Sequence, residues 1–474
     1  MRPERPLPYS DDFTSPENYV SSLLTFANTC DTFQMFAGGV HLLDFFTNDR
    51  SLYEMSLPAD WQPYILAQEP MDFVDLLLRR DLDALPEAER PPPALERYIR
   101  DVRRLSLRRG FAPRRAPPPI QGKGKGKALV PGGLTRKVAI GMNPKKVHEV
   151  INFADYVDDL AASIAAQSGG GDEETGGDEE TGGDEGNGGD EDNSDGSGAI
   201  THLVDFGSGQ NYLGRTLALP PYNRHVVAVE GRAHNIEASR ALDVKAGLST
   251  REKVMRNKKM WLQGHGVRFN ITARMMACQA PANWTEAESH GFFTRNLYRA
   301  VLQKMFLDRG VITKVYHRPS GEGQTTTAAA EADQGGPRRQ GEGDTPFDVS
   351  TNPVTIGSLN KRCYTSFNAY VRGAVQKLTT NKEYTKYSAI VQAKMGDVTD
   401  EEIADYEARF ASRGREVSAV WSLMAFSAGI VESLIVTDRW LFLEEADVVK
   451  DAWVETVFDY KQSPRNLVVV GIKK

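Results

Sequence analysis

Cysteine is scarce in this chain of 474 residues, which has only Cys30, Cys278 and Cys363. The three stand far apart and form no Cys-x-x-Cys pair, so we expect neither a disulfide framework nor a structural zinc site. No apolar run approaches the roughly 20 residues that span a bilayer, and the first residues lack the apolar core of a signal peptide. These absences predict an intracellular protein, cytoplasmic or nuclear, with no metal and no membrane partner.

Acidic residues are unevenly distributed. Residues 168–198 hold 12 Asp and Glu but no Lys or Arg, so leaving them out changes the net charge from -7 to +5. The unit Gly-Gly-Asp-Glu-Glu-Thr occurs at 170–175 and again at 176–181. Like charges and glycine predict a disordered insert here. The mildly basic remainder leaves nucleic acid open as a partner and equally fits an ordinary solvated surface.

The first part of the chain has the spacing of amphipathic helices. Apolar residues recur every three or four positions, for example at Leu23 and Ala27. We therefore predict an N-terminal helical domain over 1–109. A linker over 110–133, rich in Pro, Gly and Lys, cannot form a core. A second domain is predicted over 134–474, with two disordered inserts, 168–198 and 318–346.

The second domain begins with an alternation of helix and strand. A helix over 143–166 is predicted, because its first residue is a capping Asn and Pro144 suits the next position. Residues 200–206 and 225–230 have the composition of short buried strands, and a helix is expected between them from about Asn211. Strand, glycine turn, helix and strand make a βαβ unit.

The turn of this unit has the residues of a nucleotide-binding loop. Asp205, Gly207 and Gly209 stand where the first strand ends, and glycine lets the backbone approach a ligand closely. The following helix N-terminus offers free amide donors. Glu230 ends the second strand, where an acid reaches the hydroxyls of a ribose. These features suit either a dinucleotide or S-adenosylmethionine.

Two details favour S-adenosylmethionine as the cofactor. The third glycine of a dinucleotide fingerprint is absent, because that position is Tyr212. Asp205 also stands two residues before the first glycine, where a carboxylate suits the methionine ammonium better than a pyrophosphate. The predicted cofactor-binding residues are Asp205, Gly207, Ser208, Gly209, Asn211, Tyr212 and Glu230.

Several stretches resemble the methyltransferase-like 25 family, also named ribosomal RNA adenine dimethylase domain-containing proteins, and in particular its fungal-type members. The resemblance implies a class I methyltransferase with a seven-stranded Rossmann-like sheet, and a hairpin over 453–472 fits the last two strands. It implies S-adenosylmethionine bound over Asp205, Gly207, Gly209 and Glu230. The stretches that carry it are residues 142–150, 204–213, 229–232, 270–274, 432–441 and 457–467.

The chain departs from the family pattern in one region. Family members carry Leu-His-x-Cys-Gly-Asp/Asn-Leu on the fourth strand and Gly-Cys-Cys-Tyr after the fifth, and this sequence has neither. The gap falls near 259–266, so we expect the third to fifth strands to be missing or replaced, as in a shortened form or a faulty gene model. The predicted fold class is α/β, an incomplete Rossmann-like sheet with an N-terminal helical domain and disordered linkers.

Three functions stay open at this point. The first is a methyltransferase of unknown acceptor, either RNA or protein. The second, favoured by the missing motifs, is a non-catalytic S-adenosylmethionine-binding or scaffold protein, and the third is a nicotinamide-dependent oxidoreductase. Lys146 and His148, on the helix before the first strand, either face the pocket or pack as ordinary residues. We expect Asp438 and Arg439 to form an internal ion pair.

Overall fold

The computed structural model describes residues 2–39, 41–115, 134–168, 200, 202–248, 276–277, 279–316 and 349–474. The predicted inserts and most of the predicted linker lie outside the described residues. Tertiary contacts divide the chain into two compact units. The strand unit comprises 1–6, 109–258 and 453–470, and the helical unit comprises 7–108, 259–452 and 471–474. The domain boundaries expected from the sequence stay a prediction.

The N-terminal part of the helical unit consists of short helices, as the apolar spacing predicts. Ser15 caps the first, since its side chain accepts a hydrogen bond from the Asn18 N–H. Leu23 and Ala27 lie on its buried face. The helices are α1 (Pro16–Thr29), α2 (Asp31–Gln34), α3 (Leu52–Ser56), α4 (Trp61–Ala67), α5 (Pro70–Leu78) and α6 (Pro93–Leu105).

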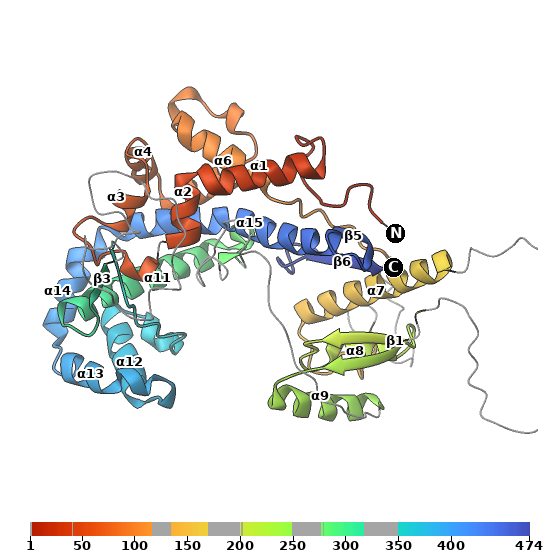
Figure 1. Ribbon diagram of the computed structural model, residues 1–474. Coiled ribbons are helices and arrows are strands. Elements are labelled where there is room, and N and C mark those ends of the chain that lie inside the picture. The colour runs from red at the N-terminus through yellow and green to blue at the C-terminus, as the bar shows by residue number, and fades with distance from the viewer. Residues whose placement is uncertain are drawn as a thin grey trace, which may run out of the picture. The chain divides into compact units, whose positions relative to one another are not determined.

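The core of the helical unit forms around α15 (Gly414–Glu444), which packs against α1, α4, α5, α6 and α11 (Glu286–Asp308). Figure 1 shows α15 with α11 alongside it. The Tyr98 and Ser427 hydroxyls lie 2.6 Å apart. The Leu107 N–H donates to Ser433 Oγ at 2.9 Å. These bonds satisfy polar groups that the apolar core would otherwise leave unpaired.

Helix α15 corrects one expectation. It is 31 residues long, and an 18-residue window within it has a mean hydropathy of 1.8, so by length and composition it could cross a membrane. No such segment was expected from the sequence. However, 72% of its apolar window is buried inside the helical unit, and a helix that is apolar all round is also typical of a protein core.

The remaining elements of the helical unit follow α11. Strands β3 (Lys314–Tyr316) and β4 (Val349–Thr351) pair antiparallel. Helices α12 (Phe367–Thr380) and α13 (Thr385–Met395) pack together, and α14 (Asp400–Ala411) packs on α12.

The strand unit contains the predicted βαβ arrangement. Strands β1 (His202–Phe206) and β2 (His225–Val229) are parallel, with Asp205 opposite Ala228. Helix α8 (Tyr212–Ala218) connects them and packs against α7 (Pro144–Ser168), and α9 (Ala233–Ala246) follows β2. The Asn143 side chain accepts a hydrogen bond from the Lys146 N–H at 2.8 Å and so caps α7 as expected.

The wider sheet stays a prediction. Among the described residues, β1 and β2 form a two-stranded sheet, and β5 (Val449–Thr456) and β6 (Leu467–Lys473) form another. The predicted hairpin of β5 and β6 is therefore present. Among the described residues, neither of its strands pairs with β1 or β2. A helical chain with small sheets and a parallel βαβ unit is compatible with the α/β class.

The expectation that both strands are buried was wrong, because every residue of β1 and β2 is exposed or only partly buried. Val204, Phe206 and Val227 are 53%, 72% and 48% exposed. Side chains alternate across a strand, and the register places Val204 opposite Val227. A continuous apolar run predicts burial on both faces, but no described segment covers this face.

Candidate functional site

The turn after β1 has the backbone of a ligand-binding loop. Gly207, Gly209 and Asn211 have φ angles of 77°, 59° and 55°, a left-handed conformation that glycine, and to a lesser extent Asn, adopts without strain. The N–H groups of Gly207 and Ser208 donate to the Val229 carbonyl at 2.7 and 3.1 Å. These bonds hold the loop against the end of β2.

The Glu230 carboxylate binds the same loop from the end of β2. One oxygen accepts the Gly209 N–H at 2.8 Å, and the other accepts the N–H groups of Gly231 and Arg232 at 2.9 and 2.8 Å. The amide of Arg232 has the largest effect on the pKa of Glu230, and with the Asn235 side chain and the amides of Gly209 and Gly231 it lowers that pKa. Glu230 is therefore ionised and anchored beside the glycine turn.

Asp205 lies one residue before the end of β1 and is partly buried. Burial raises the pKa of its carboxyl group, because the charged form loses hydration. Among the described residues no hydrogen bond to this carboxylate is seen. A cation placed beside Asp205 would restore the favourable environment for its charge.

A buried polar network that was not predicted from the sequence supports the loop from α8 and α9. Asn211 Nδ2 donates to one Asp243 oxygen at 3.0 Å, and Arg215 Nη1 lies 3.4 Å from the other. The side chains of Arg215 and Asp243 are 0% and 3% exposed. Burial lowers the pKa of Arg215 and raises that of Asp243, so both charges are only partly compensated. Arg215 and Asp243 lie 28 residues apart in sequence, so no local pattern predicts their contact.

Gly214 belongs to the same network. A Cβ atom at this position would lie 2.0 Å from the Asn211 side-chain oxygen, so any larger residue would displace Asn211. Tyr212 connects the loop to the segment before α7, because its hydroxyl lies 2.9 Å from the Gly141 carbonyl and 2.7 Å from Gln210 Oε1. The predicted residues Asn211 and Tyr212 thus position the loop, whereas Gly207, Gly209 and Glu230 form it.

The other two predicted pocket residues contact different partners. Lys146 Nζ pairs with Glu149 at 2.5 Å. His148 Nε2 accepts the Asp459 N–H at 3.1 Å, and Glu149 accepts the Ser463 hydroxyl at 2.9 Å. Burial lowers the pKa of His148, which favours the neutral ring that this acceptor role requires. These contacts join residues 142–150 and 457–467, two of the stretches that carry the family resemblance.

Asn466 holds the end of the second of these stretches. Its side chain is fully buried, and its Nδ2 donates to the Phe458 carbonyl at 3.0 Å and to the Arg109 carbonyl at 3.3 Å. Arg109 Nη1 donates to the Asn466 side-chain oxygen at 3.3 Å. Asn466 therefore closes the turn between β5 and β6.

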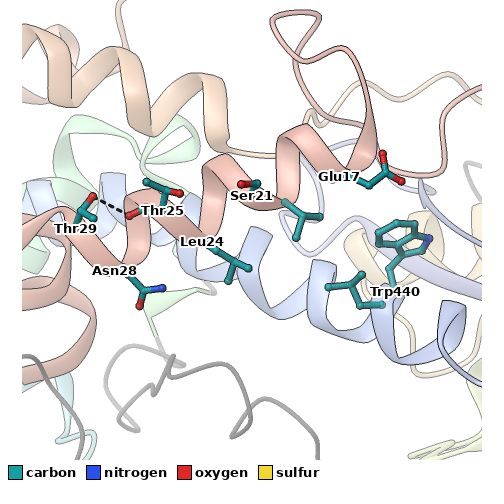
Figure 2. A pocket seen from close by; sticks show the side chains of 9 residues that line it. Glu17, Ser21, Leu24, Thr25, Asn28, Thr29 and Trp440 are labelled. Atoms are coloured by element: carbon teal, nitrogen blue, oxygen red, sulfur yellow. Dashed lines mark hydrogen bonds between the residues drawn. The ribbon is translucent and has the colours of Figure 1, made fainter.

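A cavity lies in the helical unit between α1 and α15. Its volume is about 610 Å³, and Figure 2 shows its lining from α1, with Glu17, Leu24 and Asn28, and from α15, with Trp440. Trp440 Nε1 donates to the Ala452 carbonyl at 3.2 Å. Nearby, Arg439 pairs with Asp438 at 3.0 Å, as the sequence predicted. Among the described residues no group of three metal-ligating side chains occurs.

Two comparisons with known proteins match part of the chain. Residues 190–280, which include the glycine turn and Glu230, match the model of a methyltransferase domain. The "Probable methyltransferase-like protein 25" of Mus musculus is 31% identical over 128 residues. These matches confirm the resemblance to the methyltransferase-like 25 family.

The methyltransferase-like 25 match is partial. It covers 27% of this chain and 19% of the mouse protein's length, and no solved structure matches the chain. The matches support a methyltransferase-family protein with an α/β domain, and they give no support to the nicotinamide-dependent alternative. Assignment to the fungal-type members of the methyltransferase-like 25 family stays a prediction.

Proposed function

We propose that the strand unit binds S-adenosylmethionine at the turn after β1 and that the protein transfers its methyl group. One observation carries the proposal. The left-handed turn at Gly207 and Gly209 lies at the carboxyl ends of two parallel strands, with the Glu230 carboxylate bound to the Gly209 amide. Ligands of open α/β sheets bind outside this edge.

The residues present fit such a ligand. A Cβ atom at Gly207 or Gly209 would meet no other atom within 4 Å, so the backbone there faces open space. Glycine at these positions therefore allows the positive φ and lets a ligand approach the backbone closely. The Glu230 carboxylate has about four acceptor positions, which three amides and Asn235 now use. A ribose hydroxyl can bind to Glu230 when it replaces one of these four donors.

In this proposal each acid has a separate task. Glu230 accepts hydrogen bonds from the ribose hydroxyls, as an acid at the end of the second strand does in related βαβ sites. Asp205 accepts the methionine ammonium, whose positive charge offsets the burial that raises the pKa of this carboxyl group. The bound cofactor supplies an electrophilic methyl group on a sulfonium. The loop positions it, since orientation accounts for much of an enzymatic rate.

The methyl acceptor is proposed only by class, as RNA or protein, and an intracellular location without a membrane partner stays a prediction. Calorimetric titration of the full chain with S-adenosylmethionine tests the site. Asp205→Ala and Glu230→Ala should each weaken binding at least roughly tenfold, as expected for a lost charged hydrogen bond. Glu237→Ala, which removes an exposed acid on α9, is the matched control and should leave affinity unchanged.

Two results would contradict the proposal. Unchanged affinity in both Asp205→Ala and Glu230→Ala, with the helical circular dichroism intact, would remove the site. Tight binding with no methyl transfer to either total RNA or protein from the source cells would remove the transferase and leave a cofactor-binding scaffold.

A further inference from the structure

The segment that forms α12 and α13 is strongly basic. Residues 360–395 contain seven Lys and Arg residues but one acidic residue, Glu383. Arg372 pairs with Asp400 at 2.6 Å, and Lys394 lies at the C-terminal end of α13, beside the ion pair of Arg309 with Asp397. Setting these two apart leaves five cations, which we call the basic surface: Lys361, Arg362, Lys377, Lys382 and Lys386.

The elements that carry the basic surface pack on one another, and Lys377 contacts a tyrosine between them. Lys377 Nζ donates to the Ser358 carbonyl at 2.9 Å and lies 5.5 Å from the Tyr384 ring centroid. The Tyr384 hydroxyl donates to the Ile356 carbonyl at 2.8 Å. Lys382 and Lys386 flank Tyr384 in sequence, and the turn with Lys361 and Arg362 packs on α12. Figure 1 shows α12 and α13 side by side in this part of the helical unit.

Most of this charge is not neutralised. Lys361, Arg362, Lys382 and Lys386 are exposed, and none of the four forms an ion pair within the part of the chain that the structure describes. Glu383 is the one acid among them, so the surface keeps a net charge of about +4 (its five cations less Glu383). Such a local excess attracts a polyanion.

We propose that the basic surface binds the phosphate backbone of a single-stranded nucleic acid. Tyr387 lies beside Lys386 and is partly exposed, with Lys386 Nζ 4.5 Å from its ring centroid. Cations interleaved with an accessible aromatic ring match the two contacts that single strands make, phosphate pairing and base stacking. The inference does not depend on the cofactor site, which lies in the strand unit.

An anionic membrane fits the same surface less well. A membrane-binding helix combines cations with large exposed apolar side chains. The described part of this surface offers only Ile390, which is 37% exposed. Charge without an apolar face favours a soluble polyanion. The accessible ring of Tyr387 favours a polyanion that carries bases.

Fluorescence anisotropy tests the inference with a labelled oligouridylate of about 20 nucleotides, long enough for one site. The full chain is compared with Lys361→Gln/Lys382→Gln/Lys386→Gln over a salt series. Each phosphate contact on a single strand contributes about 0.7 to the slope of log K against log salt. The triple variant should therefore lower the slope by about 2 and weaken binding at least roughly tenfold at about 0.1 M salt. Every variant keeps Lys123, Lys125 and Lys127, so any contribution of these lysines to binding is the same in each protein.

The control is Lys450→Gln/Lys473→Gln/Lys474→Gln, which removes three exposed lysines elsewhere and should leave the slope unchanged. Tyr387→Leu should weaken binding roughly fivefold or more, whereas Tyr387→Phe should not, because stacking needs the ring alone. Equal slopes in the two triple variants would overturn the proposal. So would equally tight binding of polyglutamate or of phosphatidylserine vesicles, or equal affinities of the Tyr387→Leu and Tyr387→Phe proteins.

Discussion

Glu230 accepts a hydrogen bond from the Gly209 N–H at 2.8 Å, so the end of the second strand holds the turn that follows the first. The bond lies inside the proposed cofactor site, and a ligand must either use it or replace it. The same carboxylate also binds the amides of its own turn. A change at Glu230 therefore alters the loop and the ligand contact together.

Glu230→Gln separates these two effects. The amide oxygen of Gln still accepts from Gly209, but the charge is lost. We expect the Gln variant to bind S-adenosylmethionine better than Glu230→Ala and less well than the wild-type protein, since charged hydrogen bonds are about twice as strong as neutral ones. Calorimetry measures the three affinities. Equal affinities for Glu230→Gln and Glu230→Ala would show that the loop contact has no part in binding.

Binding should depend on pH through Asp205. Burial raises the pKa of Asp205. In the folded protein its carboxyl group therefore stays protonated at pH values above the ordinary Asp pKa of about 3.9. The stability that protonation contributes is therefore lost as pH rises through the raised pKa. A cationic ligand favours the carboxylate, so affinity should rise with pH over this window and binding should release a proton.

Asp205→Asn is the control for the pH effect. Calorimetry in two buffers of different ionisation enthalpy measures the proton release directly, and the Asn variant should show none. Proton release of equal size in both proteins would place the titrating group elsewhere.

The buried pair of Arg215 and Asp243 predicts a large stability effect. Asp243→Ala leaves a fully buried guanidinium without its partner, which costs about 3–5 kcal/mol. Replacing both residues, as Arg215→Met with Asp243→Leu, should recover most of that loss, because the apolar pair needs no hydration. Urea denaturation followed by circular dichroism measures both. A double variant no more stable than Asp243→Ala would mean that the charges are not the cause.

Replacing His148 tests whether this residue stabilises the fold or lies in the cofactor pocket. His148→Ala removes the acceptor for the Asp459 N–H and the ring packing near Phe111 and Phe458. The free energy of unfolding should fall by about 1–3 kcal/mol, while the affinity for S-adenosylmethionine should change less than in Glu230→Ala. A loss of affinity as large as that of Glu230→Ala, with stability unchanged, would place His148 in the pocket.

The sequence predicts the local parts of the strand unit well. The capping Asn143 and the following Pro144 define the start of α7, and the glycines mark the turn between β1 and α8. Such signals lie within a few neighbouring residues. Helix caps and left-handed turns are set by local chemistry, and for that reason they can be predicted without the fold.

Features that depend on distant contacts could not be predicted. Arg215 and Asp243 meet across two helices, and neither has a neighbour in sequence that signals a buried charge. The apolar run of β1 predicts burial, but Phe206 is 72% exposed, because burial depends on what packs above a strand. The 31-residue length of α15 likewise follows from the core that surrounds it.

Titration of the full unmodified chain with S-adenosylmethionine, with a nicotinamide dinucleotide as the comparison ligand, tests directly which cofactor the glycine turn binds. We expect saturable binding of S-adenosylmethionine and none of the dinucleotide at the same concentrations, because the turn of Gly207 and Gly209 is followed by Tyr212 rather than a third glycine. Tight binding of the dinucleotide with no S-adenosylmethionine binding would contradict this expectation.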